Sequence, residues 1–489
     1  MALLAAAGAG LYNAVALWRH ATYQSGIDLA LYGQAVRHYA AGEAPWSSLK
    51  AQAPFNLWGD HFTPLVALLG PFYRLWPDVR LLLVAQSLLL GAAVLIVGWR
   101  LVGRTSPALG VSAAAVLAAS WGLANAARFD FHEIAFAVPL IALAVMAAQD
   151  GAWWRLGALS CALWLVKEDM TLLTAGLALY LWATRRRRAA LILGAASCLA
   201  GAVIVGLVIP GLSQSGRYTY WGQLGGPSTL AVIAANLASP QVWLCLAVIA
   251  ATLGLGALSP IAWVIVPTLA ARLVTATPAL FALSHHYNAV LMPVCLLAAA
   301  DAWRRLQTGH ADQADSGRAD RPADPGAGGP NRLDRPAASH TGRPTRTTTG
   351  RPTRTVTATK ALQVVLWVGT AVFGLARLAD ATLAGGPACA DNRCLALDQA
   401  VASIPADAKV AADVFVAPHL VDRAEPYLAV PGWTDSTGRP LRDITWLIAD
   451  TSDYRTDHPP GWEARLTAEL LRQGYHQRSA AGTVVVLSD

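Results

Sequence analysis

The amino-acid sequence predicts an all-α polytopic membrane protein with about eleven transmembrane helices and a small C-terminal α/β domain. Three observations support this fold class. Hydrophobic residues make up 55% of the 489 residues and charged residues only 14%, whereas soluble domains carry about 25% charged residues. Apolar runs near or above the ~18 residues of a membrane-spanning helix recur along most of the chain. Residues 390–489 instead alternate helix-like and strand-like patterns, which is typical of a compact α/β unit.

Eleven apolar segments are expected to span the membrane. They are residues 1–18, 79–101, 107–127, 134–149, 153–166, 170–184, 189–210, 241–257, 260–275, 287–303 and 361–378. The first segment is predicted to be a helix rather than a signal peptide, because Arg19 and His20 follow it without a cleavage site. Residues 62–77 are too short and too proline-rich to span, so they are expected to be a re-entrant or interfacial segment.

The chain divides into four predicted regions. A transmembrane domain covers 1–306 and contains a large first outer loop at 19–78. Residues 307–358 are rich in Pro, Gly, Asp, Arg and Thr and repeat GRPTRT, so we expect a disordered cytoplasmic linker. A solvated tether is a simpler role for its arginines than binding of nucleic acid or lipid headgroups. The last transmembrane helix is expected at 359–380 and the soluble α/β domain at 390–489.

The distribution of charge along the chain predicts the orientation of the protein. With the N-terminus in the cytoplasm, four of the five expected cytoplasmic joints carry arginine, including the run Arg185–Arg188. The expected outer joints carry acids instead. We therefore expect a plasma (inner) membrane protein embedded in the lipid bilayer, with its C-terminal domain outside the cytoplasm. There Cys389 and Cys394 are close enough in sequence for a local disulfide, although free thiols are an equal alternative. The net charge of +7 does not indicate a nucleic-acid partner, because the basic residues cluster at segment ends and in the linker.

Four short polar motifs interrupt the apolar chain, and all are expected on the outer side. They are Asp28 with Asp60-His61, the stretch Arg128–Glu133, the triplet Lys167-Glu168-Asp169, and Ser284–Tyr287. Ionisable residues at a membrane boundary are costly to bury, so they are candidates for function by default. Loops that share one side of the membrane can converge on one cleft.

Each motif also has a purely structural alternative. Asp28 could be a helix N-cap, and Asp60-His61 could only end a turn. Asp130, His132 and Glu133 could bind a divalent cation such as Mg²⁺ or Mn²⁺, or could simply be solvated at the interface. The two remaining motifs also have both a functional and a structural interpretation. Lys167 could contact a phosphate or form an internal salt bridge with its neighbours Glu168 and Asp169, and His285-His286 could bind a ligand, transfer protons or be an ordinary loop pair.

Other classes of site have little support in the sequence, because their motifs are absent. The chain contains no G-x-x-x-x-G-K-[ST], GxSxG or HExxH sequence. A proton- or ion-coupled carrier would place paired ionisable residues in the middle of its spans. The expected spans are nearly free of charge, which argues against such a carrier.

The order of these motifs resembles a bacterial family of multi-pass membrane proteins of unknown function, which is similar in layout to the GT-C glycosyltransferases. The segments that carry the resemblance are GIDLALYGQAVRHYAAGE, WGDHFTPLVALLGPFYRLWP, RFDFHEIAFAVPLIALA, LVKEDM, HHYNAVLMP and VAPHLVDRAEPYL. Together they cover nearly the whole chain except the linker at 307–358.

This resemblance implies a GT-C-like fold and a membrane glycosyltransferase. Such an enzyme transfers a sugar from a polyprenyl-phosphate donor to an envelope glycan or protein acceptor on the outer membrane face. Asp28 matches the essential acid of the first loop, although it is followed by Leu29 where many GT-C enzymes have a second acid. Asp60 is the second candidate for the catalytic base. Substrate binding is then expected from His61, Arg128, Lys167, Glu168, Asp169, Arg217, His285 and His286. The alternative is a non-enzymatic or transport-type envelope protein that handles a lipid or polysaccharide precursor.

Overall fold

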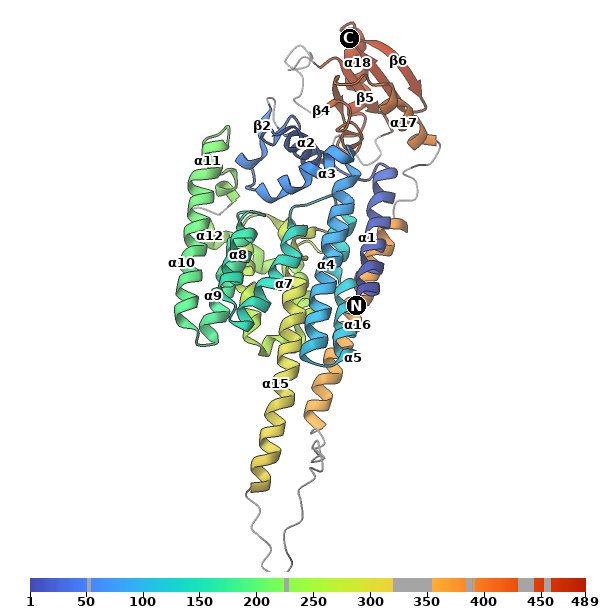
Figure 1. Ribbon diagram of the computed structural model, residues 1–489. Coiled ribbons are helices and arrows are strands. Elements are labelled where there is room, and N and C mark those ends of the chain that lie inside the picture. The colour runs from blue at the N-terminus through green and yellow to red at the C-terminus, as the bar shows by residue number, and fades with distance from the viewer. Residues whose placement is uncertain are drawn as a thin grey trace, which may run out of the picture.

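Long apolar helices form most of the molecule in a computed structural model of the chain (Figure 1). The structure describes residues 1–50, 54–223, 228–319, 354–383, 389, 392–429, 444–452 and 459–489. Within these residues, five helical segments are long and apolar enough to cross a membrane: Arg80–Arg104, Pro107–Arg128, Arg187–Leu212, Pro240–Leu258 and Lys360–Asp380. Shorter apolar helices pack among them. The mostly helical fold class is confirmed, and the total of eleven spans stays a prediction.

The helices follow the expected segments closely. Their bounds are α1 (Ala2–Ala21), α2 (Ile27–Ala41), α3 (Gly70–Leu75), α4 (Arg80–Arg104), α5 (Pro107–Ala118), α6 (Trp121–Arg128), α7 (Ile134–Asp150), α8 (Trp153–Trp164), α9 (Met170–Ala183), α10 (Arg187–Val203), α11 (Ile209–Leu212), α12 (Thr229–Ala238), α13 (Pro240–Leu253), α14 (Val266–Leu273), α15 (Leu291–Ala319) and α16 (Arg354–Leu383). Two details differ from the expectation. The segment at 107–127 breaks at Ala119–Ser120, and α12 was not anticipated.

Glycines allow the closest approaches between these helices. A Cβ atom on Gly374 of α16 would lie 2.0 Å from the carbonyl oxygen of Ala119, at the break between α5 and α6. A Cβ atom on Gly176 of α9 would lie 2.0 Å from the carbonyl oxygen of Val264. Small residues at such contacts let backbones pack closely, which is a main source of helix association in membranes.

The polar segment after α1 folds across one end of the helix bundle. It contains α2, the short antiparallel strands β1 (Trp46–Ser47) and β2 (Phe55–Asn56), a 3₁₀ turn at Pro64–Leu69 and α3. Helix α2 ends at Gly42, whose φ of 80° is readily adopted only by glycine. Residues 29–36 of α2 are all buried, because the bundle lies on one side of the helix and the C-terminal part of the chain on the other.

The C-terminal part is a five-stranded sheet with a helix on each face. Its elements are α17 (Arg393–Ser403), β3 (Lys409–Ala412), β4 (Glu425–Leu428), β5 (Trp446–Asp450), α18 (Trp462–Arg472), β6 (His476–Ala481) and β7 (Val484–Ser488). The strand order is β4-β3-β5-β7-β6, parallel across β4, β3 and β5 and antiparallel at β7 and β6. Alternate side chains of the strands pack against α17 on one face and α18 on the other. The expected α/β unit is therefore present, and Cys389 and Cys394 form a disulfide.

This sheet unit is docked on the first loop rather than held apart from the bundle. Tyr73 donates a hydrogen bond of 2.6 Å to the carboxylate of Asp422, which also accepts one of 3.0 Å from the backbone N–H of Val79. Arg37 of α2 donates to the carbonyl oxygens of Val421 and Ala424 at 3.0 and 2.9 Å. We call this end of the bundle the sheet end, and the end that carries Asp150 the far end.

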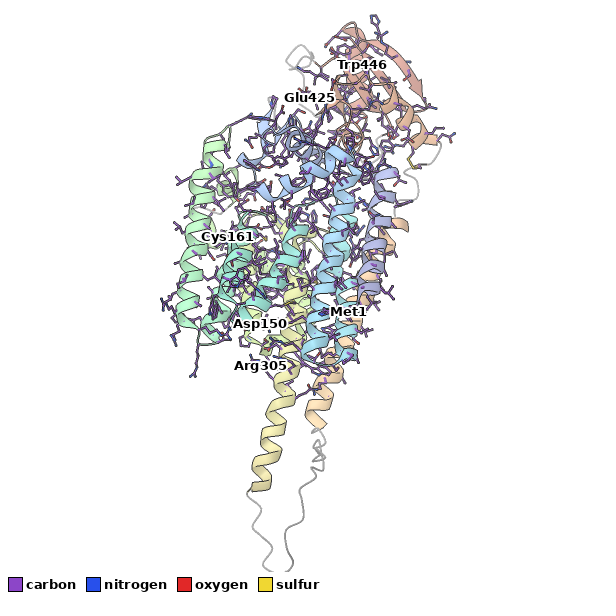
Figure 2. All side chains as sticks on the ribbon, in the orientation of Figure 1. Met1, Asp150, Cys161, Arg305, Glu425 and Trp446 are labelled. Atoms are coloured by element: carbon purple, nitrogen blue, oxygen red, sulfur yellow. A yellow bond between two sulfur atoms is a disulfide. The ribbon has the colours of Figure 1, made fainter. Side chains whose placement is uncertain are left out.

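Figure 2 shows Glu425 and Trp446 in the sheet unit, with Asp150 and Arg305 at the far end of the bundle. Helices α15 and α16 both reach into the range predicted to be a linker, since they run to Ala319 and from Arg354. Residues 320–353 lie outside the described residues. The four predicted domain boundaries therefore stay predictions.

Candidate functional site

A cavity of about 270 Å³ lies at the sheet end, where five connecting segments meet. Seven of the candidate residues line it: Asp28, Asp60, His61, His132, Lys167, His285 and His286. The other lining residues are Leu31, Tyr32, Lys50, Leu57, Phe129, Tyr220 and Tyr287. Segments that are more than 250 residues apart in the sequence thus converge on one polar space.

Asp28 stands in the first turn of α2 and faces this cavity. The N-cap of α2 is Gly26, so the alternative that Asp28 caps the helix is wrong. One carboxylate oxygen of Asp28 lies 3.4 Å from Nε2 of His132. Burial of the carboxyl favours its neutral form, but the charge of His132, its hydrogen bond and the charge of Lys50 together hold the pKa of Asp28 below its ordinary value. Asp28 is therefore an ionised carboxylate at neutral pH.

His132 carries the compensating positive charge. Its Nδ1 lies 3.1 Å from the carbonyl oxygen of Asp130, and its Nε2 faces the Asp28 carboxylate. Because both ring nitrogens face acceptors, this arrangement favours the doubly protonated, cationic ring. Burial opposes this charge, but Asp28 and Glu133 raise the pKa of His132 above its usual value. The ring of His286 stacks on that of His132 with centroids 3.6 Å apart, and burial together with the His132 charge lowers the pKa of His286 well below its usual value.

A second buried ion pair forms the floor of the site. Glu133 is fully buried, and its carboxylate lies 2.9 Å from Nζ of Lys167 and accepts a hydrogen bond from the Tyr32 hydroxyl. Burial opposes ionisation of Glu133, but Lys167 and His132 lower its pKa to about 2. Lys167 therefore has its salt bridge with Glu133, not within its own sequence triplet, and still lines the cavity.

Asp60 and His61 form another wall of the cavity. Asp60 accepts hydrogen bonds from Lys50 at 2.6 Å and from the Tyr220 hydroxyl at 3.0 Å. His61 stacks on Tyr220 with ring centroids 4.7 Å apart, and its Nδ1 lies 2.7 Å from the Glu168 carboxylate. Glu168 thus supports the wall from outside the cavity, since it also accepts from the backbone N–H of Phe62 at 3.1 Å.

The expected metal ligands do not form a metal site. Both oxygens of Asp130 accept hydrogen bonds from the backbone N–H of Gly26, at 2.9 and 2.8 Å. His132 turns to Asp28, and Glu133 turns to Lys167. Within the described part of the chain, no three His, Cys, Asp or Glu side chains are placed to share one ion. A divalent cation does not fit these residues, because their donors point to three different partners.

Three further candidates lie outside the cavity lining. Asp169 is half-buried next to Glu168, and desolvation raises the pKa of its carboxyl to about 6 even though Lys167 opposes this rise. Arg128 points to α16, where it pairs with Asp380 at 3.2 Å. Arg217 is exposed on the loop after α11. The structure therefore does not bring Arg128 or Arg217 to the site.

Some residues of the site were not anticipated. Lys50 and Tyr32 line the cavity, but a single lysine or tyrosine carries no pattern that marks it. Arg272 of α14 is buried beneath the site and donates to Asn288 Oδ1 and the carbonyl oxygen of Tyr287, both at 2.7 Å. A lone arginine in an apolar run was a detectable signal for Arg272, since such residues need a partner. Through these two hydrogen bonds Arg272 positions the turn at His285–Asn288.

The fold and this cavity define a class: a multi-pass membrane protein with a charged pocket at one end of its helix bundle. Residues 19–320 match the family described as "Predicted membrane protein (DUF2079)". This match covers more than half of the chain, which therefore belongs to that family. The resemblance found in the motifs is thus confirmed. A comparison with curated proteins found no match.

Among solved structures, the fold is similar to the crystal structure of ArnT from Cupriavidus metallidurans bound to undecaprenyl phosphate. The TM-score is 0.51 at 12% sequence identity, and the match covers 99% of this chain and 97% of that chain. At this identity the likeness shows the fold alone. The expected fold is therefore confirmed as one that this chain shares with ArnT.

Proposed function

We propose that this protein is a membrane glycosyltransferase that transfers a sugar from a polyprenyl-phosphate donor to a hydroxyl group of an envelope glycan or protein. One observation carries the proposal. A single cavity holds the ionised carboxylate of Asp28 together with the cationic groups of Lys50, His132 and Lys167. Glycosyl transfer from a phosphate needs a base for the acceptor and positive charge for the departing phosphate.

Asp28 is the better candidate for the base. Both oxygens of Asp60 already accept hydrogen bonds, from Lys50 and Tyr220. Only one oxygen of Asp28 has a partner among the described residues, the His132 ring at 3.4 Å. The second oxygen is free to accept a proton from an acceptor hydroxyl. In this assignment Asp60 positions Lys50 and does not contact the reacting atoms.

The reaction then proceeds as a displacement at the anomeric carbon. The acceptor hydroxyl gives its proton to Asp28 while its oxygen forms the new bond to the sugar. The bond between the anomeric carbon and the phosphate oxygen breaks, and polyprenyl phosphate leaves with its electron pair. Lys50 and Lys167 line the cavity and stabilise the negative charge of the phosphate. Lys50 is the more accessible of the two, since 36% of its side chain is exposed against 14% for Lys167.

The comparison with ArnT supports the class of donor. That protein was solved with undecaprenyl phosphate, which is a polyprenyl phosphate, and it shares the fold of this chain over nearly its whole length. The proposal places the sheet end on the outer side of the plasma membrane and the N-terminus in the cytoplasm. The arginine-rich joints at the far end support this orientation. Eleven spans and the boundaries at 1–306, 307–358, 359–380 and 390–489 belong to the same proposal.

The test compares Asp28→Asn with Asp60→Asn and with Asp407→Asn, which removes an exposed carboxylate of the sheet unit. In each strain the gene of the variant replaces the native gene. We then measure the abundance of the protein in the membrane, the lipid-linked sugars and the envelope glycans. Removal of a general base lowers the transfer rate by about 10²–10⁴-fold. Cells with Asp28→Asn should therefore lose the glycan and accumulate the lipid-linked donor, while the abundance of the protein in the membrane stays normal. Asp407→Asn should match the parent. A parental glycan profile in Asp28→Asn would contradict the proposal and favour a non-enzymatic or transport role.

A further inference from the structure

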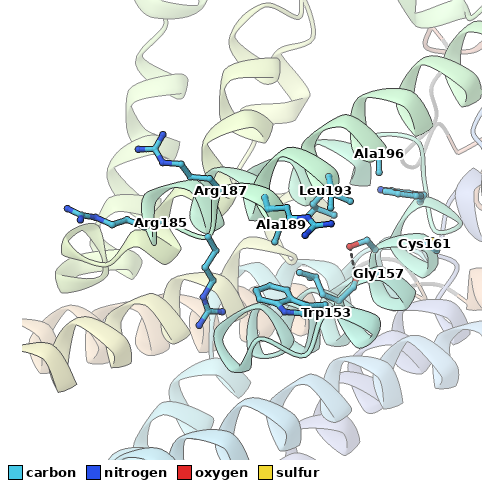
Figure 3. Close-up of a pocket in the computed structure, with 14 residues that line it drawn as sticks. Trp153, Gly157, Cys161, Arg185, Arg187, Ala189, Leu193 and Ala196 are labelled. Carbon is cyan, nitrogen blue, oxygen red and sulfur yellow. Dashed lines mark hydrogen bonds between the residues drawn. The ribbon is translucent and has the colours of Figure 1, made fainter.

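A second cavity begins at the far end of the bundle and shares no lining residue with the candidate site. Its volume is about 1040 Å³, and it lies between α8 and α10. Figure 3 shows Trp153, Gly157 and Cys161 on one helix and Ala189, Leu193 and Ala196 on the facing helix. The spacing of three or four residues on each helix places these side chains on one stripe, so the groove has a continuous apolar lining.

One end of the groove is strongly basic. All four residues of the run Arg185–Arg188 line it, and no Asp or Glu is among the described residues that do. This end is the far end of the bundle, because Arg186 donates hydrogen bonds to the carbonyl oxygens of Ala148 and Gln149, next to Asp150. The nearest acid, Asp150, is already paired with Arg100 and Arg104.

The four arginines are not equivalent. Arg186 caps the end of α7 and lies over the Trp153 ring, with 5.4 Å to the centroid. Arg187 lies over the Trp182 ring at 4.5 Å. The guanidinium groups of Arg185 and Arg188 have no ion pair or hydrogen bond within the part of the chain that the structure describes, and both side chains are exposed. Two unneutralised cations thus stand at the mouth of an apolar groove.

The dimensions of the groove match one leaflet of a bilayer. Its α8 wall runs from Trp153 to Trp164, twelve residues, which is about 18 Å of helix. Half of a bilayer's hydrocarbon core is about 15 Å thick. A chain lying along this wall would therefore extend from the headgroup level toward the middle of the membrane. Basic pockets between transmembrane helices bind anionic lipid headgroups by the same combination of charge and apolar wall.

We propose that this groove binds one anionic phospholipid, with its phosphate at Arg185 and Arg188 and one acyl chain along α8 and α10. This site is independent of the sugar-transfer cavity, which lies at the sheet end. The charge of the arginines selects the anionic headgroup, and the apolar stripe selects a lipid over a soluble phosphate.

The test uses the purified full-length protein in detergent, with palmitoyl-oleoyl phosphatidylglycerol and the matching phosphatidylcholine as probes. Bound lipid is counted by native mass spectrometry. Each arginine near a membrane surface contributes about fivefold in affinity for an anionic lipid. Arg188→Gln should therefore lower phosphatidylglycerol binding about fivefold and the double variant Arg185→Gln/Arg188→Gln further. Arg155→Gln is the matched control, since Arg155 is an exposed arginine that does not line the groove, and it should bind like the parent.

A second pair of variants tests the groove without changing charge. A Cβ atom on Gly157 meets nothing within 4 Å, so Gly157→Leu can fold and will fill the groove. Gly103→Leu is the control, because Gly103 is equally open and lies on α4 away from the groove. Gly157→Leu should lose phosphatidylglycerol at an unchanged melting temperature. Three results would overturn the proposal. The parent could bind phosphatidylcholine as well as phosphatidylglycerol, or inorganic phosphate alone could displace the bound lipid. The third is full phosphatidylglycerol binding by both Gly157→Leu and the double arginine variant.

Discussion

Asp130 shows how burial at a single residue couples protonation to stability. Its carboxylate is nearly enclosed, and the backbone N–H of Gly26 is its hydrogen-bond donor. Burial, together with the nearby charge of Asp28, raises the pKa of Asp130 from 3.8 to about 6. The folded state therefore holds this proton more tightly than the unfolded chain. The resulting stability is fully present below pH ~4 and is lost as the pH rises through about 6.

We expect Asp130→Asn to remove this pH dependence, because the amide oxygen still accepts from Gly26 but does not ionise. A shift of about two pKa units corresponds to roughly 3 kcal/mol. The melting temperature of the parent, measured from pH 4 to pH 7 in detergent, should fall more steeply than that of the variant. Asp407→Asn, which removes an exposed carboxylate, should keep the parental slope. Equal slopes for the parent and Asp130→Asn would show that Asp130 does not hold the proton.

Single site residues could be predicted where an ionisable side chain stands in an otherwise apolar chain. Asp28, Asp60, His61, Lys167 and the two histidines at 285–286 stand out in an apolar chain, and all of them line the cavity. Their partners were not predictable. The expected metal ligands lie at positions 130, 132 and 133, but in an irregular loop such neighbours point in different directions. Whether they share an ion depends on the backbone path and not on their spacing.

At the scale of elements, the packing of α16 against the break between α5 and α6 depends on one glycine. We expect Gly374→Val to reduce the yield of folded protein sharply, because a Cβ atom there would meet the carbonyl oxygen of Ala119 at 2.0 Å. Such a backbone clash cannot be relieved by a side-chain rotation, and overpacking costs about 1–3 kcal/mol or more. Size-exclusion profiles and melting temperatures of the solubilised protein measure the effect.

Gly369→Val is the matched control for this prediction. Gly369 lies on the same helix, and a Cβ atom there meets nothing within 4 Å. This variant should behave like the parent. Similar losses in both variants would mean that β-branching in α16, and not the contact with Ala119, causes the defect.

Most elements were predicted because their signal is local. Apolar length marks the helices, and buried runs mark β3, β5 and β7. Strand β6 was missed because all six of its residues are exposed and it has no apolar face. Strand β4 was missed because it is short and contains Pro426. The break at Ala119–Ser120 was missed because a serine in a long, mostly apolar run does not by itself predict a helix end. Gly374 packs closely against this break.

At the scale of the molecule, docking of the sheet unit supports the candidate site. We expect Asp422→Ala to loosen this contact, because Tyr73 and the Val79 N–H would lose their buried acceptor. Leaving a buried donor unsatisfied costs about 1–3 kcal/mol. Protease sensitivity of the sheet unit should rise. Sugar transfer should fall, because the same sheet unit also contacts Arg37 of α2, the helix that carries Asp28.

Asp407→Ala tests the same interface at its exposed rim. It removes the ion pair of Arg37 with Asp407, whose side chain is 84% exposed. Exposed pairs contribute about 0–1 kcal/mol, so this variant should keep the parental proteolysis pattern. A larger effect from Asp407→Ala than from Asp422→Ala would contradict the buried contact as the source of docking.

The proposed orientation predicts which surface is reached from outside the cell. Cys161 and Cys198 are first replaced by alanine. Single cysteines are then introduced at Ser215, in the loop that leads to Tyr220 of the cavity, and at Ala108, four residues after Arg104, which pairs with Asp150 of the far end. A membrane-impermeant maleimide should label Ser215→Cys in intact cells and Ala108→Cys only after the cells are opened. The reverse pattern would show that the sheet end faces the cytoplasm.

The sequence by itself determined the class of this protein, its helices and the set of charged residues that require an explanation. It could do so because apolar length, charge asymmetry and isolated ionisable groups are local properties of the chain. Only the tertiary structure decided that Asp28 faces His132, that Glu133 pairs with Lys167, and that the sheet unit packs on α2. These contacts join loops that are far apart in the sequence. Their partners are set by the packing of helices around glycines and small residues, which no single segment encodes.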